Sequence, residues 1–339
     1  MDPTDPSSFN HRSERLSTGR TYHFVDQKPF KSFIKDTPTL LLIHGFPDSW
    51  YGWRYQIGPW AKRGWRIIAV DALGYGGTDK PTEVSAYSTK SICKDLTALL
   101  DLLKVEKAAI VGHDWGAEIA WRMYLWHPER VLTVVALSIP YSPPAPSYIP
   151  LSIVAKRVPG LGYQVYLEDP RSTKDIESNL RTFLDMIYRS DSLTWKWVEV
   201  EKLENFLRGK DKFPDGPSVL SSSEMNFYVK QFENSMSGPL MYYKTKRIRF
   251  NDEKVAKLPS FLPTETAFLL IRGTEDPASP KQAAKRSRNF AKSLKTIDLD
   301  GAGHWLMIER KEEVTKYVGD WIESVLREAR QENKPSTKL

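Results

Sequence analysis

Short apolar runs of strand length alternate with helical patterns in the first half of the chain, and this alternation constrains the fold more than any other feature. The runs lie at residues 40–43, 67–70, 108–111 and 134–137. Because each run is continuously apolar, it suits a strand that is buried on both faces, as in a parallel sheet. Between residues 92 and 103, apolar positions repeat every three or four residues, as in a helix packed on such a sheet. The sequence therefore predicts an α/β fold with a mostly parallel central sheet flanked by helices.

The alternation stops in the middle of the chain and returns near its end. Residues 267–271 form another strand-like run, and the apolar stripe of a closing helix follows. Five prolines within residues 140–150 open a stretch that has only helical or irregular patterns. We interpret residues 140–251 as an inserted helical lid, or cap domain, and residues 1–139 and 252–339 as the core domain. A lid inserted there would cover a pocket at the carboxyl ends of the parallel strands.

Composition excludes several classes of protein. With 339 residues, 40% of them hydrophobic and 12% aromatic, the chain can bury a sizeable core and cannot be mainly disordered. The formal net charge of +7 could indicate that the protein binds nucleic acid. The basic stretches match no nucleic-acid-binding module, however, and we interpret them as solvent-exposed surface. No apolar run reaches the roughly 18 residues that a membrane-spanning helix needs. We expect neither a nucleic acid nor a membrane as a partner.

The cysteine content and the two ends of the chain indicate the cellular compartment in which the protein is expected. The single cysteine, Cys93, cannot form an intramolecular disulfide, and residues 1–10 lack the apolar core of a secretory signal. These features predict a cytoplasmic protein. The last residues, Thr337, Lys338 and Leu339, nearly match the Ser-Lys-Leu peroxisomal signal, so a peroxisomal fraction is a second hypothesis.

The motif with the clearest chemical meaning is Gly112-His113-Asp114-Trp115-Gly116, between a strand-like run and a helical pattern. Its spacing is that of a nucleophile elbow, a strand-to-helix turn so tight that only glycine fits on either side. Such a turn lifts the central side chain above the sheet, and the helix N-terminus favours its negative charge. A carboxylate there can attack carbon and form a covalent ester. Taken alone, the motif fits an aspartate that caps the helix equally well.

Two later motifs supply an acid and a histidine. Asp276 and His304 each follow a strand-like run, so the order along the chain is nucleophile, acid, histidine, as in the α/β-hydrolase fold. An unperturbed histidine pKa of ~6.5 leaves His304 neutral at working pH and able to act as a general base. The carboxylate of Asp276 would hold its tautomer, with Glu275 as the second candidate for the acid.

The segment His44-Gly45-Phe46-Pro47 follows the first strong strand, where hydrolases of this architecture place backbone donors. The N–H groups of Phe46 and Trp115 are the candidate oxyanion hole, and His44 is a candidate pocket residue. By itself the segment is better explained as an ordinary Gly-Pro turn.

In these motifs and in their order, the sequence resembles the soluble epoxide hydrolases of the α/β-hydrolase fold. The resemblance covers most of the chain. The family uses two lid tyrosines, which by resemblance are Tyr163 and Tyr243, with Tyr166 and Tyr242 as close alternatives. The family often has asparagine where Met241 stands here.

The resemblance implies conversion of a small apolar epoxide and water to a vicinal diol without metal or organic cofactor. Asp114 would attack a ring carbon to form an alkyl ester, and lid tyrosines, neutral with a pKa near ~10, would donate to the ring oxygen. His304 would then activate water to hydrolyse the ester. No histidine and cysteine cluster with metal-ligand spacing occurs in the sequence.

Two other functions stay open. A haloalkane dehalogenase would use the same ester chemistry but needs side-chain N–H donors for halide, which Trp115 and a lid tryptophan, Trp195 or Trp197, could supply. A non-enzymatic small-molecule receptor on the same scaffold is expected to carry a broken triad, whereas this one is complete. A serine esterase is disfavoured because no Gly-x-Ser-x-Gly motif occurs. The lid tryptophans are also candidate pocket residues, although they could equally form the lid's own core. The sequence leaves the epoxide, the stereochemistry and the oligomeric state open.

Overall fold

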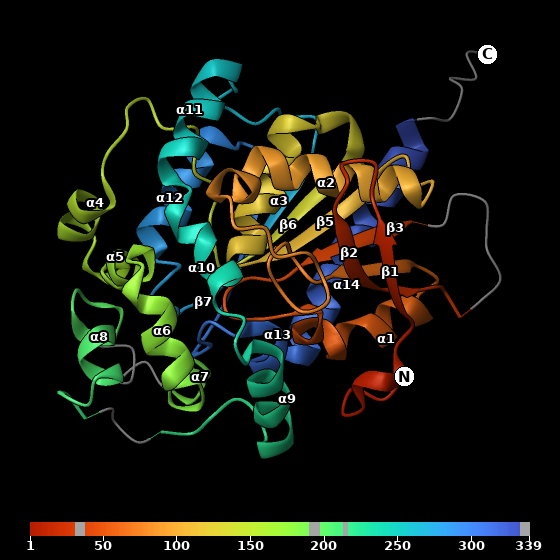
Figure 1. Ribbon diagram of the computed structural model, residues 1–339. Coiled ribbons are helices and arrows are strands. Elements are labelled where there is room, and N and C mark those ends of the chain that lie inside the picture. The colour runs from red at the N-terminus through yellow and green to blue at the C-terminus, as the bar shows by residue number, and fades with distance from the viewer. Residues whose placement is uncertain (31–37, 190–196, 213–215, 333–339) are drawn as a thin grey trace, which may run out of the picture.

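The computed structural model describes residues 1–30, 38–189, 197–212 and 216–332 (Figure 1). Within them, eight strands form one sheet in the order β1-β2-β4-β3-β5-β6-β7-β8. The strands are β1 (His11–Arg15), β2 (Thr21–Gln27), β3 (Thr39–Ile43), β4 (Arg66–Val70), β5 (Ala108–His113), β6 (Val131–Leu137), β7 (Phe268–Gly273) and β8 (Leu294–Leu299). β1 and β2 pair antiparallel, as do β2 and β4, and every other pairing is parallel.

The central strands are buried along their whole length. Every residue of β3, β4, β5 and β7 is buried, which explains why these strands have continuous apolar runs instead of alternating ones. The flanking helices pack in pairs, α1 against α14 and α2 against α3, and α3 and α14 also contact β6. These helices are α1 (Arg54–Lys62), α2 (Thr89–Leu102), α3 (Trp115–Trp126), α12 (Lys281–Phe290), α13 (Leu306–Glu309) and α14 (Lys311–Glu332). The predicted fold class, a mostly parallel sheet flanked by helices, is confirmed, while the antiparallel pair β1 and β2 was not predicted.

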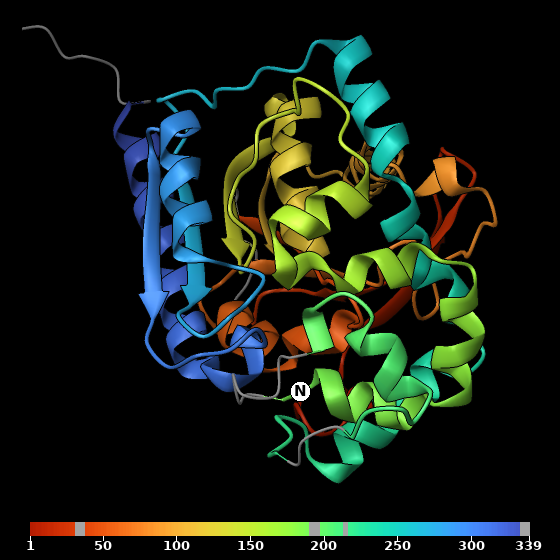
Figure 2. The ribbon, with the colours of Figure 1, turned by 90° about the vertical axis from the view of Figure 1, so that its left-hand side faces the viewer.

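Helices fill the chain between β6 and β7. They gather on one side of the core in both ribbon views (Figures 1 and 2). They are α4 (Leu151–Arg157), α5 (Tyr163–Glu168), α6 (Arg171–Ser178), α7 (Leu180–Ile187), α8 (Lys202–Leu207), α9 (Ser222–Phe232), α10 (Ser237–Lys244) and α11 (Lys246–Ala256). Short 3-10 helices also occur at Pro6–Ser8, Trp50–Trp53, Val84–Tyr87, Pro128–Arg130 and Pro159–Leu161. The predicted lid boundary at residue 251 falls inside α11, and the division into core and lid stays a prediction.

Hydrogen bonds tie these helices to loops that follow the carboxyl ends of core strands. The Tyr188 hydroxyl donates to the Pro47 carbonyl after β3 (2.6 Å), and the Trp305 indole N–H after β8 donates to the Ile187 carbonyl (2.9 Å). The helical segment therefore covers the edge of the sheet at which side chains after parallel strands converge. No helix in the described ranges is long and apolar enough to cross a membrane. Residues 337–339, which carry the near-match to a peroxisomal signal, lie outside the described residues.

Candidate active site

Asp114 stands in a strained conformation between β5 and α3. Its φ of 52° and ψ of −119° are rare for a residue with a side chain. The elbow can be this tight because a Cβ at Gly112 would overlap the Gly116 carbonyl, and a Cβ at Gly116 would overlap the Ile43 carbonyl of the neighbouring strand. The side chain of Asp114 does not make the hydrogen bond of a helix cap, and its only bond to α3 in the described residues comes from the amide of the adjacent Trp115. The capping interpretation therefore does not describe this aspartate.

Backbone amides from two segments face the Asp114 carboxylate. The Phe46 N–H donates to Asp114 Oδ1 (2.9 Å), and Gly45 lies so close that a Cβ there would overlap the Asp114 side chain. Burial raises the pKa of Asp114, while the charge of His304 and hydrogen bonds from the amides of Phe46 and Trp115 partly offset this rise. The structure thus brings both amides predicted for the oxyanion hole to the predicted nucleophile.

His304 lies between the two aspartates. Its Nδ1 is 3.0 Å from both carboxylate oxygens of Asp276, and its Nε2 is 3.7 Å from Asp114 Oδ2. Burial alone would lower the pKa of His304, but the charge and hydrogen bond of Asp276, together with the charge of Asp114, raise it to about 9. Burial opposes ionisation of Asp276 as well, yet His304 holds the pKa of this carboxyl below its ordinary value. The neighbouring acid considered from the sequence, Glu275, is exposed.

Two polar side chains, one buried and one half-buried, support this arrangement and were not predicted. Ser138, the first residue after β6, donates from Oγ to Asp276 Oδ2 (2.5 Å). The Glu309 carboxylate in α13 accepts hydrogen bonds from the N–H groups of Gly303 and Trp305, both at 2.8 Å. Since these residues flank His304, Glu309 anchors the loop that carries the imidazole. The sequence signal for Ser138 was its place directly after a strand. Glu309 carried no signal, because a glutamate in the charged stretch 309–313 is normally expected to be solvated.

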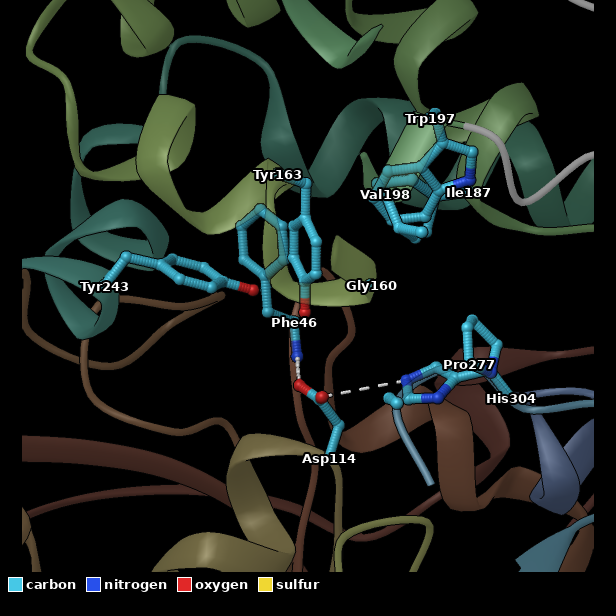
Figure 3. Close-up of a pocket in the computed structure, with 11 residues that line it drawn as sticks. Phe46, Asp114, Gly160, Tyr163, Ile187, Trp197, Val198, Tyr243, Pro277 and His304 are labelled. Carbon is cyan, nitrogen blue, oxygen red and sulfur yellow. Dashed lines mark hydrogen bonds and ion pairs between the residues drawn. The ribbon is translucent and has the colours of Figure 1, made fainter. Parts of the chain in front are cut away.

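Tyr163 and Tyr243 point toward Asp114 from the covering helices (Figure 3). Their ring centroids are 6.2 Å apart, and the ring of Tyr243 packs edge-on against those of Phe46 and Trp115. Burial raises the pKa of both phenols, and the nearby Asp114 charge adds to the rise. Both hydroxyls are therefore neutral hydrogen-bond donors at physiological pH.

The alternative tyrosines are hydrogen-bonded elsewhere. The Tyr166 hydroxyl donates to Asp175 (2.8 Å), and the Tyr242 hydroxyl donates to the Leu73 carbonyl (2.9 Å). Neither lines the pockets that reach Asp114.

The three other residues predicted to line the substrate pocket do not share one position. Trp197 lines a small pocket together with Asp114 and His304, and its ring packs edge-on against that of Tyr163 (centroids 5.2 Å apart). Trp195 lies outside the described residues. His44 lines neither of the two pockets that reach Asp114, which differs from the prediction. Its Nε2 accepts from the Ala72 N–H (2.9 Å) and its Nδ1 lies 2.8 Å from the Gly45 carbonyl, so both ring nitrogens are used to hold the loop.

Asp114 lies where two pockets meet. The smaller, of about 30 Å³, is bounded by Phe46, the two tyrosines and His304 and has room for one or two water molecules (Figure 3). The larger, of about 450 Å³, also reaches Asp114 and Tyr163 and has the size of a small-molecule site. In the described part of the chain, no cluster of three or more histidine, cysteine, aspartate or glutamate residues is arranged to hold a metal ion.

Comparisons with known proteins agree on one family. The model of the alpha/beta hydrolase fold matches residues 38–311. Among curated relatives, epoxide hydrolase srdG of Neurospora crassa is 33% identical over 347 residues, covering 96% of this chain and 98% of the relative. Bifunctional epoxide hydrolase 2 of Sus scrofa is 31% identical over 330 residues, but this chain spans only 57% of its length. A solved epoxide hydrolase from an endophytic Streptomyces superimposes with a TM-score of 0.82 at 28% identity, covering 94% of this chain and 96% of that one.

Proposed function

Because the chain belongs to the epoxide hydrolases of the alpha/beta hydrolase fold, we propose that it converts an apolar epoxide and water to a vicinal diol. The observation that carries the proposal is the placement of two neutral tyrosine hydroxyls opposite a carboxylate across one small pocket. An epoxide needs both groups at once, a nucleophile for a ring carbon and a donor for the oxygen that leaves it.

Ring opening is the first half-reaction. Asp114 attacks a ring carbon, the bond between that carbon and the ring oxygen breaks, and an alkyl ester forms on the carboxylate. The ring oxygen develops alkoxide character and receives a hydrogen bond and then a proton from Tyr163 or Tyr243. The depth at which both phenols are buried supports this role, because it keeps them protonated until the alkoxide forms.

Hydrolysis of the ester is the second half-reaction, and forming the ester prepares His304 for it. The negative charge of Asp114 is one of the contributions that raise the pKa of His304, and esterification removes this charge. The pKa of His304 then falls, so the imidazolium can give its proton to the tyrosinate left by ring opening, and the neutral imidazole can accept another from water.

Water attacks the ester carbonyl carbon, and the charge that develops on the carbonyl oxygen faces the amides of Phe46 and Trp115. Asp276 stabilises the imidazolium that forms. The bond between the carbonyl carbon and the alkyl oxygen then breaks, the departing oxygen takes the proton from His304, and the diol leaves. The acid formed on Asp114 returns its proton to His304, which restores the starting state.

A His304→Gln variant tests this proposal by blocking the second half-reaction. Its intact mass is measured after exposure to a small aryl epoxide and, separately, to a bromoalkane, and any adduct is located by peptide mapping. We expect a mass increase equal to the whole epoxide on the Asp114 peptide, and no adduct when Asp114→Asn is combined with His304→Gln. An alkyl adduct from the bromoalkane alone would indicate a dehalogenase, and no adduct from either compound would favour a receptor.

A further inference from the structure

One helix carries most of the surplus positive charge of this chain. The segment 281–295, which comprises α12 and the start of β8, contains six basic residues and no acidic one. Because the whole chain has 49 basic and 42 acidic residues, this segment accounts for six of the seven net positive charges. The six residues are Lys281, Lys285, Arg286, Arg288, Lys292 and Lys295.

The fold directs these six side chains outward. Ala284, Ser287 and Ala291 are buried and recur at intervals of three and four, so this stripe faces the sheet, where α12 contacts β8. The six basic side chains are all exposed. None of them forms an ion pair within 4.0 Å in the described part of the chain. Like charges at these spacings destabilise a helix, and an anionic partner would relieve that repulsion.

An exposed aromatic side chain borders the basic residues. Phe261 precedes β7 and is 64% exposed, and its ring centroid lies 5.3 Å from that of Phe290 in α12. The Leu262 N–H donates to the Phe290 carbonyl (2.8 Å), which holds this loop against the end of the helix. We call the six basic residues and Phe261 the basic face.

The basic face lies beside the large pocket that reaches Asp114. Ala283 of α12 lines this pocket, as does Val154 of α4. Lys156 and Arg157 in the last turn of α4 are exposed and form no ion pair within 4.0 Å among the described residues. Both helices lie on the left of the molecule in Figure 1, and this side faces the viewer in Figure 2. An extended anionic partner on this side would therefore lie next to the pocket.

We propose that the basic face binds the surface of a membrane that contains anionic phospholipids. Its basic side chains would contact the headgroups, and Phe261 would insert among them. The exposed Phe261 favours a lipid surface over a nucleic acid. The expectation of no membrane partner rests on the lack of a spanning run, whereas binding to headgroups needs none. One consequence rests on the proposed function, namely that an apolar epoxide dissolved in the membrane would enter the adjoining pocket.

Vesicle binding tests the proposal. The full chain is sedimented with sucrose-loaded vesicles of phosphatidylcholine, either alone or mixed with phosphatidylserine, at several salt concentrations. We expect binding to the mixed vesicles only, and weaker binding as salt increases. Combining Lys285→Gln, Arg286→Gln and Arg288→Gln should lower the partition coefficient roughly 100-fold, because each basic residue near an anionic surface contributes about fivefold. Phe261→Ser should lower it roughly tenfold, because less apolar surface is buried.

A matched variant elsewhere on the chain controls for the loss of charge. Lys94→Gln, Lys104→Gln and Lys107→Gln together remove three positive charges from exposed positions in and after α2. Acidic residues, Asp101 and Glu106, are interspersed among these lysines, so they do not form a uniformly basic surface. This variant should bind the mixed vesicles as tightly as the wild type, and thermal unfolding checks that every variant is folded.

Three results would overturn the membrane surface. They are equal binding to both kinds of vesicle, binding to neither, and an equal loss of binding in the two triple variants. Binding of a DNA duplex without binding of the mixed vesicles would assign the basic face to nucleic acid instead.

Hydrolysis assays test the consequence for the substrate. The triple variant of α12 should hydrolyse an apolar alkyl epoxide supplied in mixed vesicles more slowly than the wild type, and a short water-soluble epoxide at the same rate. Equal rates with both epoxides would refute entry from the membrane. Failure of the wild type to hydrolyse either epoxide would remove the proposed function, while the vesicle-binding result would stand by itself.

Discussion

Replacing Asp276 with asparagine removes the charge that faces His304. The replacement tests whether Asp276 acts in ester hydrolysis and not in ester formation. In the structure, Asp276 is the group that contributes most to raising the pKa of His304, against the opposing effect of burial, from 6.5 to about 9. This net rise, to which the Asp114 charge also contributes, corresponds to ~3 kcal/mol of stabilisation of the imidazolium, and we take this value as the scale of the Asp276 contribution. Both oxygens of Asp276 contact Nδ1 at 3.0 Å and the pair is buried, so little of this energy is screened by solvent.

If the whole stabilisation of the imidazolium is present in the transition state in which His304 takes a proton from water, removing Asp276 slows ester hydrolysis by roughly 100- to 300-fold. An amide that holds His304 in the wrong tautomer would raise the loss toward ~10⁴. Ester formation uses Asp114 and the tyrosines and should slow much less. The alkyl ester should therefore accumulate in Asp276→Asn during turnover and stay undetectable in the wild type.

Rapid quenching followed by intact-mass measurement gives the rates of ester formation and loss as a function of pH. In the wild type, ester hydrolysis should fall as pH decreases, because protonated His304 cannot accept a proton; in Asp276→Asn this fall should move to lower pH, because the pKa of His304 decreases. Glu275→Gln makes the same charge change one residue earlier on an exposed side chain and serves as the control. Equal slowing of both half-reactions, or ester accumulation in Glu275→Gln as well, would refute the role assigned to Asp276.

Three further variants test other parts of the structure. Combining Tyr163→Phe with Tyr243→Phe should abolish ester formation while leaving thermal unfolding nearly unchanged, and retained turnover of an epoxide would dismiss the tyrosine roles. Glu309→Gln replaces one of the two carboxylate oxygens that accept backbone hydrogen bonds with an N–H donor, so the free energy of unfolding in urea should fall by about 1–3 kcal/mol. Quench experiments should also show slower ester hydrolysis. Unchanged values of both quantities would show that Glu309 does not position His304. Glu224→Gln leaves the fully buried Arg54 without its counter-charge, and the free energy of unfolding in urea should fall by about 3–5 kcal/mol, whereas a loss below ~1 kcal/mol would mean that the pair acts like a surface ion pair.

The sequence alone was sufficient for features that depend on one continuous segment. The buried strands were predictable because a strand covered on both faces must be apolar at every position, as in β3 and β5. The elbow was predictable because its tightness requires small residues at Gly112 and Gly116. The motifs around these segments, taken in order, also indicated the epoxide hydrolase family, which the family model and the relatives confirm.

Only the tertiary structure could place side chains that meet from distant segments. Tyr163 and Tyr166 lie three residues apart on α5, and Tyr242 and Tyr243 are neighbours on α10, where each residue turns the side chain by about 100°. Which hydroxyl faces Asp114 depends on how each helix docks on the core, a rotation that the local pattern leaves undetermined.

The same limit applies to the groups that support the site. Glu309 holds the loop of His304, and Lys246 and Arg249 face the large pocket, yet in the sequence each of them reads as an ordinary charged residue of a helix. Local sequence sets backbone conformation and the apolar face of each element through short-range sterics and burial. The partners of a polar side chain are decided by packing across long chain separations, and that information exists only once the chain has folded.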